Sequence, residues 1–163
     1  MPQLELEQRA AEVIKNINYL NLATVTPENQ AWNTPLFFGL DKELNLYWVS
    51  GKTSQHVINL KNSPSSYATV YDSTLPVGQG FGVYLQGKSS QITELKELAQ
   101  AVLSIYSRQD KKVKAIQYFL KTFPRRVYKT VPEKVWANGL EKREESNVDI
   151  RLELNLNKLK QYL

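Results

Sequence analysis

The sequence has no cysteine and a single histidine, His56, among its 163 residues. The absence of cysteine excludes a disulfide scaffold, a thiol nucleophile and a zinc–thiolate site. With one histidine, a zinc or non-haem iron centre would need carboxylates for nearly every ligand, and no such cluster stands out. We therefore expect no metal site, and the lack of cysteine favours a cytoplasmic location.

Long apolar runs are also absent. No segment approaches the roughly 20 apolar residues of a membrane-spanning helix, and the N-terminus carries early acidic residues rather than the apolar core of a signal peptide. The chain is 42% hydrophobic and 23% charged, which is ordinary for a folded soluble protein. We expect a cytoplasmic protein without membrane contact, folded as one domain over residues 1–163.

Positive charge is in modest excess. The formal net charge is +5 and the isoelectric point is about 9.3. Lysine and arginine alternate with acids along the chain, whereas a nucleic-acid interface usually gathers them in a stripe. We expect no nucleic-acid partner, so a basic interaction domain is the least favoured alternative. A mildly basic surface favours small anionic ligands.

Segments rich in β-branched and aromatic residues dominate the chain. We expect strands at Tyr19–Val25, Ala31–Leu40, Leu44–Ser50, Tyr67–Tyr71, Phe81–Thr93, Arg126–Val131, Lys134–Leu140 and Val148–Leu156. Helices are expected at Leu4–Ile14, Ser54–Lys61, Glu94–Ser107 and Lys112–Thr122. Because strands mostly follow strands, the order predicts a mainly β protein, a small antiparallel barrel with peripheral helices. The GQGFG at 78–82 follows a loop and opens no helix, so it is not a dinucleotide-binding motif.

The stretch YWVSGKTSQHVINLKNSP, residues 47–64, joins a strand to a short helix. Thr53 or Ser54 is the candidate N-cap. A helix N-terminus presents free amide groups and a partial positive charge, which suit a phosphate. Polar side chains at the turn add hydroxyl donors or charge: Ser50, Lys52, Thr53, Ser54 and, when protonated, His56. The alternative is that these residues only cap the helix.

Residues 10–93 resemble the flavin-binding split barrel of the pyridoxamine 5′-phosphate oxidase family. The similarity lies in the order of elements: strand, turn and two strands, then the capped helix ending in Asn-Ser-Pro, then two strands with YLQG near the end. It extends more loosely through RRVYKTVPEKVWANG, residues 125–139. The resemblance implies a homodimer that holds FMN between its subunits and exchanges electrons with a small-molecule donor and acceptor.

The resemblance also implies which residues contact FMN. Beside the isoalloxazine ring it places Asn33, Thr34, Pro35 and Leu36. Val49 and Ser50 approach the flavin and its ribityl chain, and Trp136 covers the ring from the partner subunit or packs in the core. At the phosphate it places Ser54, Gln55 and His56, beside Lys52 and Thr53. Because the family often has lysine or arginine at the positions of Gln55 and His56, positive charge must come from Lys52 or from elsewhere.

Pro35 supports a ligand site independently of the resemblance. A proline inside an apolar strand is confined to a sheet edge or a bulge, because it has no N–H to donate. Backbone groups at such places are open to a ligand. The neighbouring aromatic residues have the simpler reading of core or subunit interface.

Two features separate the chain from authentic pyridoxamine phosphate oxidases. Those enzymes hold the substrate phosphate with an Arg-Leu-His motif, whereas Arg151-Leu152 is followed here by Glu153, whose carboxylate would repel a phosphate. A charged, insertion-like stretch also intervenes at Glu141–Asn147. We expect an FMN-dependent oxidoreductase with a different substrate, and no catalytic side chain is identified. The alternative is a non-catalytic carrier of flavin, deazaflavin or a tetrapyrrole.

Overall fold

The computed structural model describes residues 3–143 and 146–163. Its elements, in chain order, are α1 (Gln3–Asn16), β1 (Tyr19–Val25), β2 (Ala31–Leu40), β3 (Leu46–Gly51), α2 (Gln55–Asn62), β4 (Ser65–Tyr71), β5 (Gly82–Gln91), α3 (Leu95–Arg108), the 3-10 helix η1 (Ile116–Phe119), β6 (Arg125–Arg143), β7 (Ser146–Leu154) and α4 (Leu156–Lys160). Across the described part of the chain, no helix combines the length and apolar character needed to cross a membrane.

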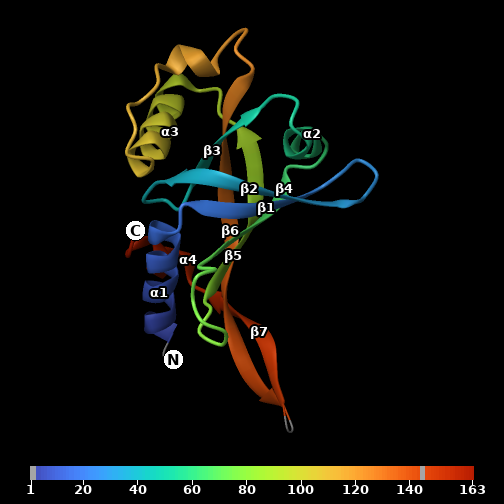
Figure 1. Cartoon of the computed structure of the whole chain (residues 1–163), viewed down its shortest axis with the longest axis vertical. Coiled ribbons are helices and arrows are strands. Elements are labelled where there is room, and N and C mark those ends of the chain that lie inside the picture. The colour runs from blue at the N-terminus through green and yellow to red at the C-terminus, as the bar shows by residue number, and fades with distance from the viewer. Residues whose placement is uncertain (1–2, 144–145) are drawn as a thin grey trace.

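The strands form one antiparallel sheet that closes on itself. Their order is β3-β2-β1-β4-β5-β6-β7, and a further pairing of β3 with β6 makes a ring of the first six. The long strand β6 serves twice: its first half pairs with β3, and its second half pairs with β7. In Figure 1 the β6–β7 hairpin extends away from the barrel. The expected mainly β, antiparallel split barrel is confirmed.

Apolar side chains pack in two layers because successive residues of a strand face opposite sides of the sheet. The barrel interior holds Phe38, Leu46 and Trp48, and helices α1, α2 and α4 contribute to the same core. On the outer face, Tyr47 and Val127 pack with α3 and η1. Strand β3 is therefore buried on both faces, which explains its unbroken apolar run. Figure 1 shows α3 above α1 on the same side of the view, and Arg108 at the end of α3 donates to the carbonyls of Ile14 and Ile17.

Three expectations about secondary structure are wrong. The helix at Lys112–Thr122 is replaced by the four-residue η1, since Val113 is 50% exposed and does not join the apolar stripe that a helix would need. A single strand, β6, runs through Pro132, where the β5–β6 register shifts at Gln86/Gly87; a bulge tolerates proline there. Residues 141–143 and 146–147 belong to the β6–β7 hairpin rather than to an insertion; 144–145 lie outside the described residues.

Candidate cofactor site

The turn between β3 and α2 leaves several polar groups free. Ser54 is the N-cap, and its carbonyl accepts from the amides of Val57 and Ile58, at 2.9 and 3.0 Å. Its side chain forms no capping bond. Within the described residues, the amide groups of Gln55 and His56 have no backbone acceptor. The start of α2 therefore presents two amides and one hydroxyl that a bound anion can use.

Gly51 leaves a gap beside that hydroxyl. A Cβ atom added to Gly51 would lie 3.2 Å from Ser54 Oγ. Directly opposite Gly51, on β6, is Arg125. Paired residues of antiparallel strands project on the same face with Cβ atoms about 4.5–5.5 Å apart. The Arg125 main chain therefore lies beside Gly51 and the start of the turn. The turn is also tied to β6 by the Lys52 amide, which donates to the Pro124 carbonyl at 3.0 Å.

His56 points into the barrel. Its ring is 6% exposed, its Nε2 lies 2.6 Å from Ser50 Oγ, and it meets the Trp48 ring at 63° and 5.5 Å between centroids. Burial lowers the pKa of His56 below its ordinary value, so the ring is neutral at pH 7. The expectation that His56 adds positive charge at the turn is therefore not supported. The side chains of His56 and Ser50 face the core, and from His56 only the main-chain amide is available.

Of the remaining polar residues of the turn, one is hydrogen-bonded within the fold and two lie at the surface. Gln55 donates from Nε2 to Asn59 Oδ1 at 2.8 Å, and buried Asn59 donates from Nδ2 to Thr24 Oγ1 at 2.9 Å. These bonds anchor α2 to β1. Lys52 is half-buried and Thr53 is exposed. Gln55 is thus engaged in the fold, whereas Lys52 and Thr53 remain at the surface of the turn.

The four predicted residues of β2 alternate between the two faces of the sheet. Thr34 and Leu36 face inward, and Leu36 is 7% exposed; Asn33 and Pro35 are exposed on the outside. Within the described residues, positions 31–37 pair with β1 only, since β3 joins at Phe38. The Phe38 amide donates toward β1, so Pro35, three positions earlier, turns its backbone groups to the open side. The predicted edge position of Pro35 is confirmed.

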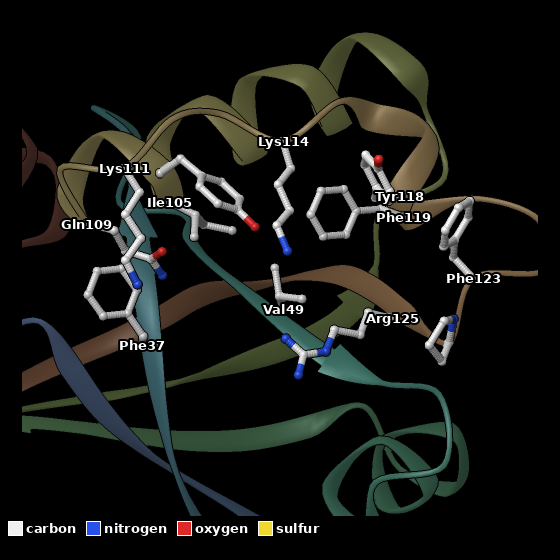
Figure 2. Close-up of a pocket in the computed structure, with 12 residues that line it drawn as sticks. Phe37, Val49, Ile105, Gln109, Lys111, Lys114, Tyr118, Phe119, Phe123 and Arg125 are labelled. Atoms are coloured by element: carbon white, nitrogen blue, oxygen red, sulfur yellow. The ribbon is translucent and has the colours of Figure 1, made fainter.

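A cavity of about 590 Å³ lies between this outer face and the α3–η1 segment. Phe37 and Val49 form its floor, and Ile105 lies on its α3 side. The Lys111, Lys114 and Arg125 side chains are directed into it from above and below (Figure 2). Predicted residue Val49 is therefore a cavity residue. Pro124 and Arg125 connect the cavity to the β3–α2 turn, because both line the cavity, Pro124 accepts from the Lys52 amide and Arg125 pairs with Gly51.

Tyr106 adds a hydroxyl to the cavity wall. Burial raises its pKa, and the nearby Arg125 opposes that shift without cancelling it. The phenol is therefore protonated at neutral pH and can donate a hydrogen bond. Sequence reasoning missed Tyr106 and the basic residues of the cavity. The sequence feature that could have pointed to this wall is the cluster of aromatic and basic residues in Lys112–Thr122, the segment interpreted as a helix.

Trp136 lies far from the cavity along the same strand. It is eleven positions beyond Arg125, which corresponds to roughly 35 Å at the usual strand rise. Its ring stacks on Tyr67 with centroids 6.2 Å apart and 19° between planes, on the outer face of the β4–β5–β6 part of the sheet. The structure thus brings the β2 edge, Val49 and the β3–α2 turn together, but Trp136 stays apart from them in one chain.

The loop before β5, residues 73–80, lies against α1. Arg9 donates from Nη2 to the Gln79 carbonyl at 3.4 Å, and its guanidinium lies 4.5 Å from the centre of the Phe81 ring. Neither Gln79 nor Phe81 lines the 590 Å³ cavity. Within one chain, this loop does not cover the candidate site.

Comparison with known proteins assigns the barrel to a class. The closed antiparallel ring with an appended hairpin is the split barrel, and the family model described as pyridoxamine 5′-phosphate oxidase matches residues 6–139. The chain therefore belongs to the pyridoxamine 5′-phosphate oxidase family. A comparison with curated protein sequences gave no match.

Solved structures share the fold at low sequence identity. A heme binding protein from Mycobacterium smegmatis is similar at a TM-score of 0.68 and 16% identity, over 96% of this chain and 60% of that one. This chain thus spans less than two thirds of that protein. A putative 5-nitroimidazole antibiotic resistance protein from Bacteroides thetaiotaomicron gives 0.68 and 17%, over 80% and 81%. An F420 reductase gives 0.57 and 19%, over 76% and 93%.

Proposed function

We propose that this protein is an FMN-binding oxidoreductase whose cofactor phosphate sits at the β3–α2 turn. The observation that carries the proposal is the unbonded start of α2, where the Ser54 hydroxyl and two amides are free next to Gly51, the residue that pairs with Arg125 of β6. A phosphate in the gap at Gly51 would accept from the Ser54 hydroxyl and from the amides of Gln55 and His56. The partial positive charge of the α2 N-terminus adds to this attraction.

Arg125 supplies fixed charge in place of the cations that the family often has at the positions of Gln55 and His56. The side chains of Gln55 and His56, where the family often has cations, are bonded to Asn59 and Ser50. An arginine guanidinium binds phosphate oxygens in a two-pronged arrangement and stays charged at any physiological pH. Arg125 forms no ion pair within the described residues, so its charge is available. Lys52 lies at the same turn as a second cation.

The space next to the turn fits a flat cofactor. The cavity volume of about 590 Å³ is within the roughly 300–1,000 Å³ of small-molecule sites. Val49 and Phe37 offer an apolar floor, and the open edge of β2 at Pro35 offers backbone groups to ring heteroatoms. When bound, FMN supplies the electron-transfer chemistry. The residues of the chain bind it, orient its ring and exclude water from one ring face.

The proposal includes a homodimer. In one chain, Trp136 and the cavity are roughly 35 Å apart along β6, so Trp136 can cover the cofactor only from a second copy. Its outer sheet face carries partly exposed aromatic rings, including Tyr67 and Tyr84. Aromatic residues of this kind are enriched at protein interfaces. A dimer that buries this face would bring each Trp136 toward its partner.

The experiment is a titration of purified protein with FMN and with riboflavin, which lacks the phosphate. We expect the purified protein to show a flavin absorption spectrum and the mass of a dimer, and to bind FMN more tightly than riboflavin. Gly51→Val fills the gap beside Ser54 and should weaken FMN binding with little effect on riboflavin. Gly80→Val is the matched control, because a Cβ there meets nothing within 4 Å. A colourless monomer that ignores FMN would contradict the proposal.

The second candidate is a carrier that binds its ligand without turnover. The similar Mycobacterium smegmatis structure, a heme binding protein, gives this candidate its support. The only histidine, however, is bonded to Ser50 in the core, so an iron ligand from His56 would require that bond to break. Repeated reduction of FMN by a nicotinamide donor distinguishes an oxidoreductase, whereas a carrier shows binding and no multiple turnovers.

A further inference from the structure

Residues 110–126, which join α3 to β6 through η1, hold the excess positive charge of the protein. They contain one acid, Asp110, and six cations: Lys111, Lys112, Lys114, Lys121, Arg125 and Arg126. Six cations less one acid give +5, the formal net charge of the whole chain, so the remainder is neutral on balance. None of the six forms an ion pair within the described residues. The alternation of cations and acids therefore fails in this segment, and its charge is uncompensated.

Apolar side chains are exposed among these cations. Val113 is half exposed, and Tyr118 and Phe123 are each more than one third exposed, although covering apolar surface is favourable. Five of the six cations are exposed as well, and Arg126 is half-buried. In Figure 1 the segment, drawn in yellow-orange to orange, lies at the top of the view, and the tip of the β6–β7 hairpin lies at the bottom. This end of the molecule is therefore open to an extended partner that is anionic and has an apolar interior.

We propose that the surface of residues 110–126 docks on a lipid bilayer that contains acidic headgroups. Lysine side chains are attracted to the negative potential of such a surface, while Val113 and the neighbouring rings enter the boundary between headgroups and acyl chains. Either signal alone gives weak binding, and the two together give reversible association. The expectation of no membrane contact was based on the lack of a long apolar run, which a spanning helix requires and a surface contact does not.

A nucleic acid is the competing anionic partner, and the side chains favour the bilayer. Binding of single strands uses aromatic faces on which bases stack. Val113 has no ring, and the rings of Tyr118 and Phe123 meet at 65° with centroids 5.1 Å apart, so they form no common platform. Four of the six cations are lysines, whereas arginine is favoured for two-pronged recognition of phosphate. A fluid bilayer adapts to such an irregular apolar surface.

Sedimentation of the full-length protein with vesicles tests the charge. We expect binding to vesicles of phosphatidylcholine mixed with phosphatidylserine, none to phosphatidylcholine alone, and weaker binding at about 0.15 M salt, which screens charges beyond roughly 8 Å. Lys112→Gln/Lys121→Gln should weaken binding about thirtyfold, since each lysine near an acidic surface contributes about fivefold. The matched control, Lys142→Gln/Lys158→Gln, changes two exposed lysines outside the segment and should bind like the unaltered protein.

Val113→Ser tests the apolar contact in the same assay. It should weaken binding to the mixed vesicles about fivefold, whereas Val77→Ser, at a fully exposed valine of another loop, should have no effect. Lys112, Val113 and Lys121 do not line the 590 Å³ cavity, so these variants should bind FMN like the unaltered protein.

The outcomes separate this proposal from the proposed function. Equal binding to both kinds of vesicle, binding to neither, or equal losses in the lysine variant and its control would each overturn the proposal. Binding of a random single-stranded oligonucleotide without binding of vesicles would replace the bilayer by a nucleic acid. Because the assay needs no flavin, a protein that fails to bind FMN yet sediments with the mixed vesicles refutes the proposed function alone.

Discussion

Alanine substitutions at Ser54 and His56 should affect different properties, although both residues lie at the start of the same helix. Ser54 Oγ forms no bond in the fold, so Ser54→Ala removes only a group that the phosphate would use. His56 is buried and bonded to Ser50, so His56→Ala removes part of the core. The first change should affect ligand binding, and the second should affect stability.

The magnitudes follow from the contacts. A serine N-cap that bonds the helix usually contributes about 1 kcal/mol; without that bond, Ser54→Ala should lower the free energy of unfolding by less than about 0.5 kcal/mol. For His56→Ala, leaving Ser50 Oγ unpaired costs about 1–3 kcal/mol, and losing the edge-on contact with Trp48 costs about 0.5–1.5 kcal/mol. Together these predict a loss of about 3 kcal/mol.

Urea unfolding of the apoproteins and fluorescence titration with FMN measure both effects. We expect Ser54→Ala to weaken FMN about tenfold at nearly unchanged stability, the size of one hydrogen bond to a charged group. His56→Gln, which retains a hydrogen-bonding group near Ser50, should lose less stability than His56→Ala. If His56→Ala unfolded almost like the unaltered protein but no longer bound FMN, the inward placement of the ring would be refuted.

The same histidine predicts a pH dependence. Burial lowers the pKa of His56 below 6.5 in the folded state, so the unfolded chain takes up a proton first as the pH falls. The contribution of neutral His56 to the free energy of unfolding should therefore be fully present above about pH 6.5. It should decrease as the pH falls from there toward the lowered pKa. His56→Gln should reduce this part of the acid sensitivity, as measured by urea unfolding between pH 5 and 8.

Two further substitutions test the packing. Gly87→Ala should lower the melting temperature strongly or prevent folding, because the added Cβ would lie 2.0 Å from the Val131 carbonyl oxygen; Gly80→Ala, with open space around it, should melt like the unaltered protein. Glu7→Gln should unfold at an equal or higher urea concentration at pH 8. The buried Glu7 accepts the Asn155 amide through Oε1 at 3.1 Å, while its Oε2 has no partner, and a neutral amide keeps the acceptor without burying a charge. A clear loss of stability would mean that the carboxylate itself is needed.

Local patterns in the sequence were sufficient for most of the barrel. The spans of β1 and β2 were predicted to the residue because turn residues bound them at Pro27 and Asp41. The helix α3 was predicted because its apolar stripe is long; in the structure Glu94 also caps it, accepting from the amides of Lys96 and Glu97. The continuous β6 was missed because a proline is a local signal, whereas the register shift that accommodates Pro132 arises only from pairing with β5.

The candidate site was predictable only in part for the same reason. The hydroxyl-rich turn and the edge proline are visible in sequence, because each follows from local chemistry. The inward orientation of His56 is not visible, since it depends on Trp48 and Ser50 across the strand–helix junction. Arg125 could not be identified either, because its place beside Gly51 is set by a strand pair separated by more than seventy residues in the chain.

The location of the FMN phosphate tests the central claim most directly, and a crystal structure of the protein grown with FMN would measure it. We predict phosphate density in the gap at Gly51, within hydrogen-bonding distance of Ser54 Oγ and of the Arg125 guanidinium, with the flavin ring against the outer face of β2 and β3. A flavin bound elsewhere, with that gap empty or filled by protein groups, would contradict the account.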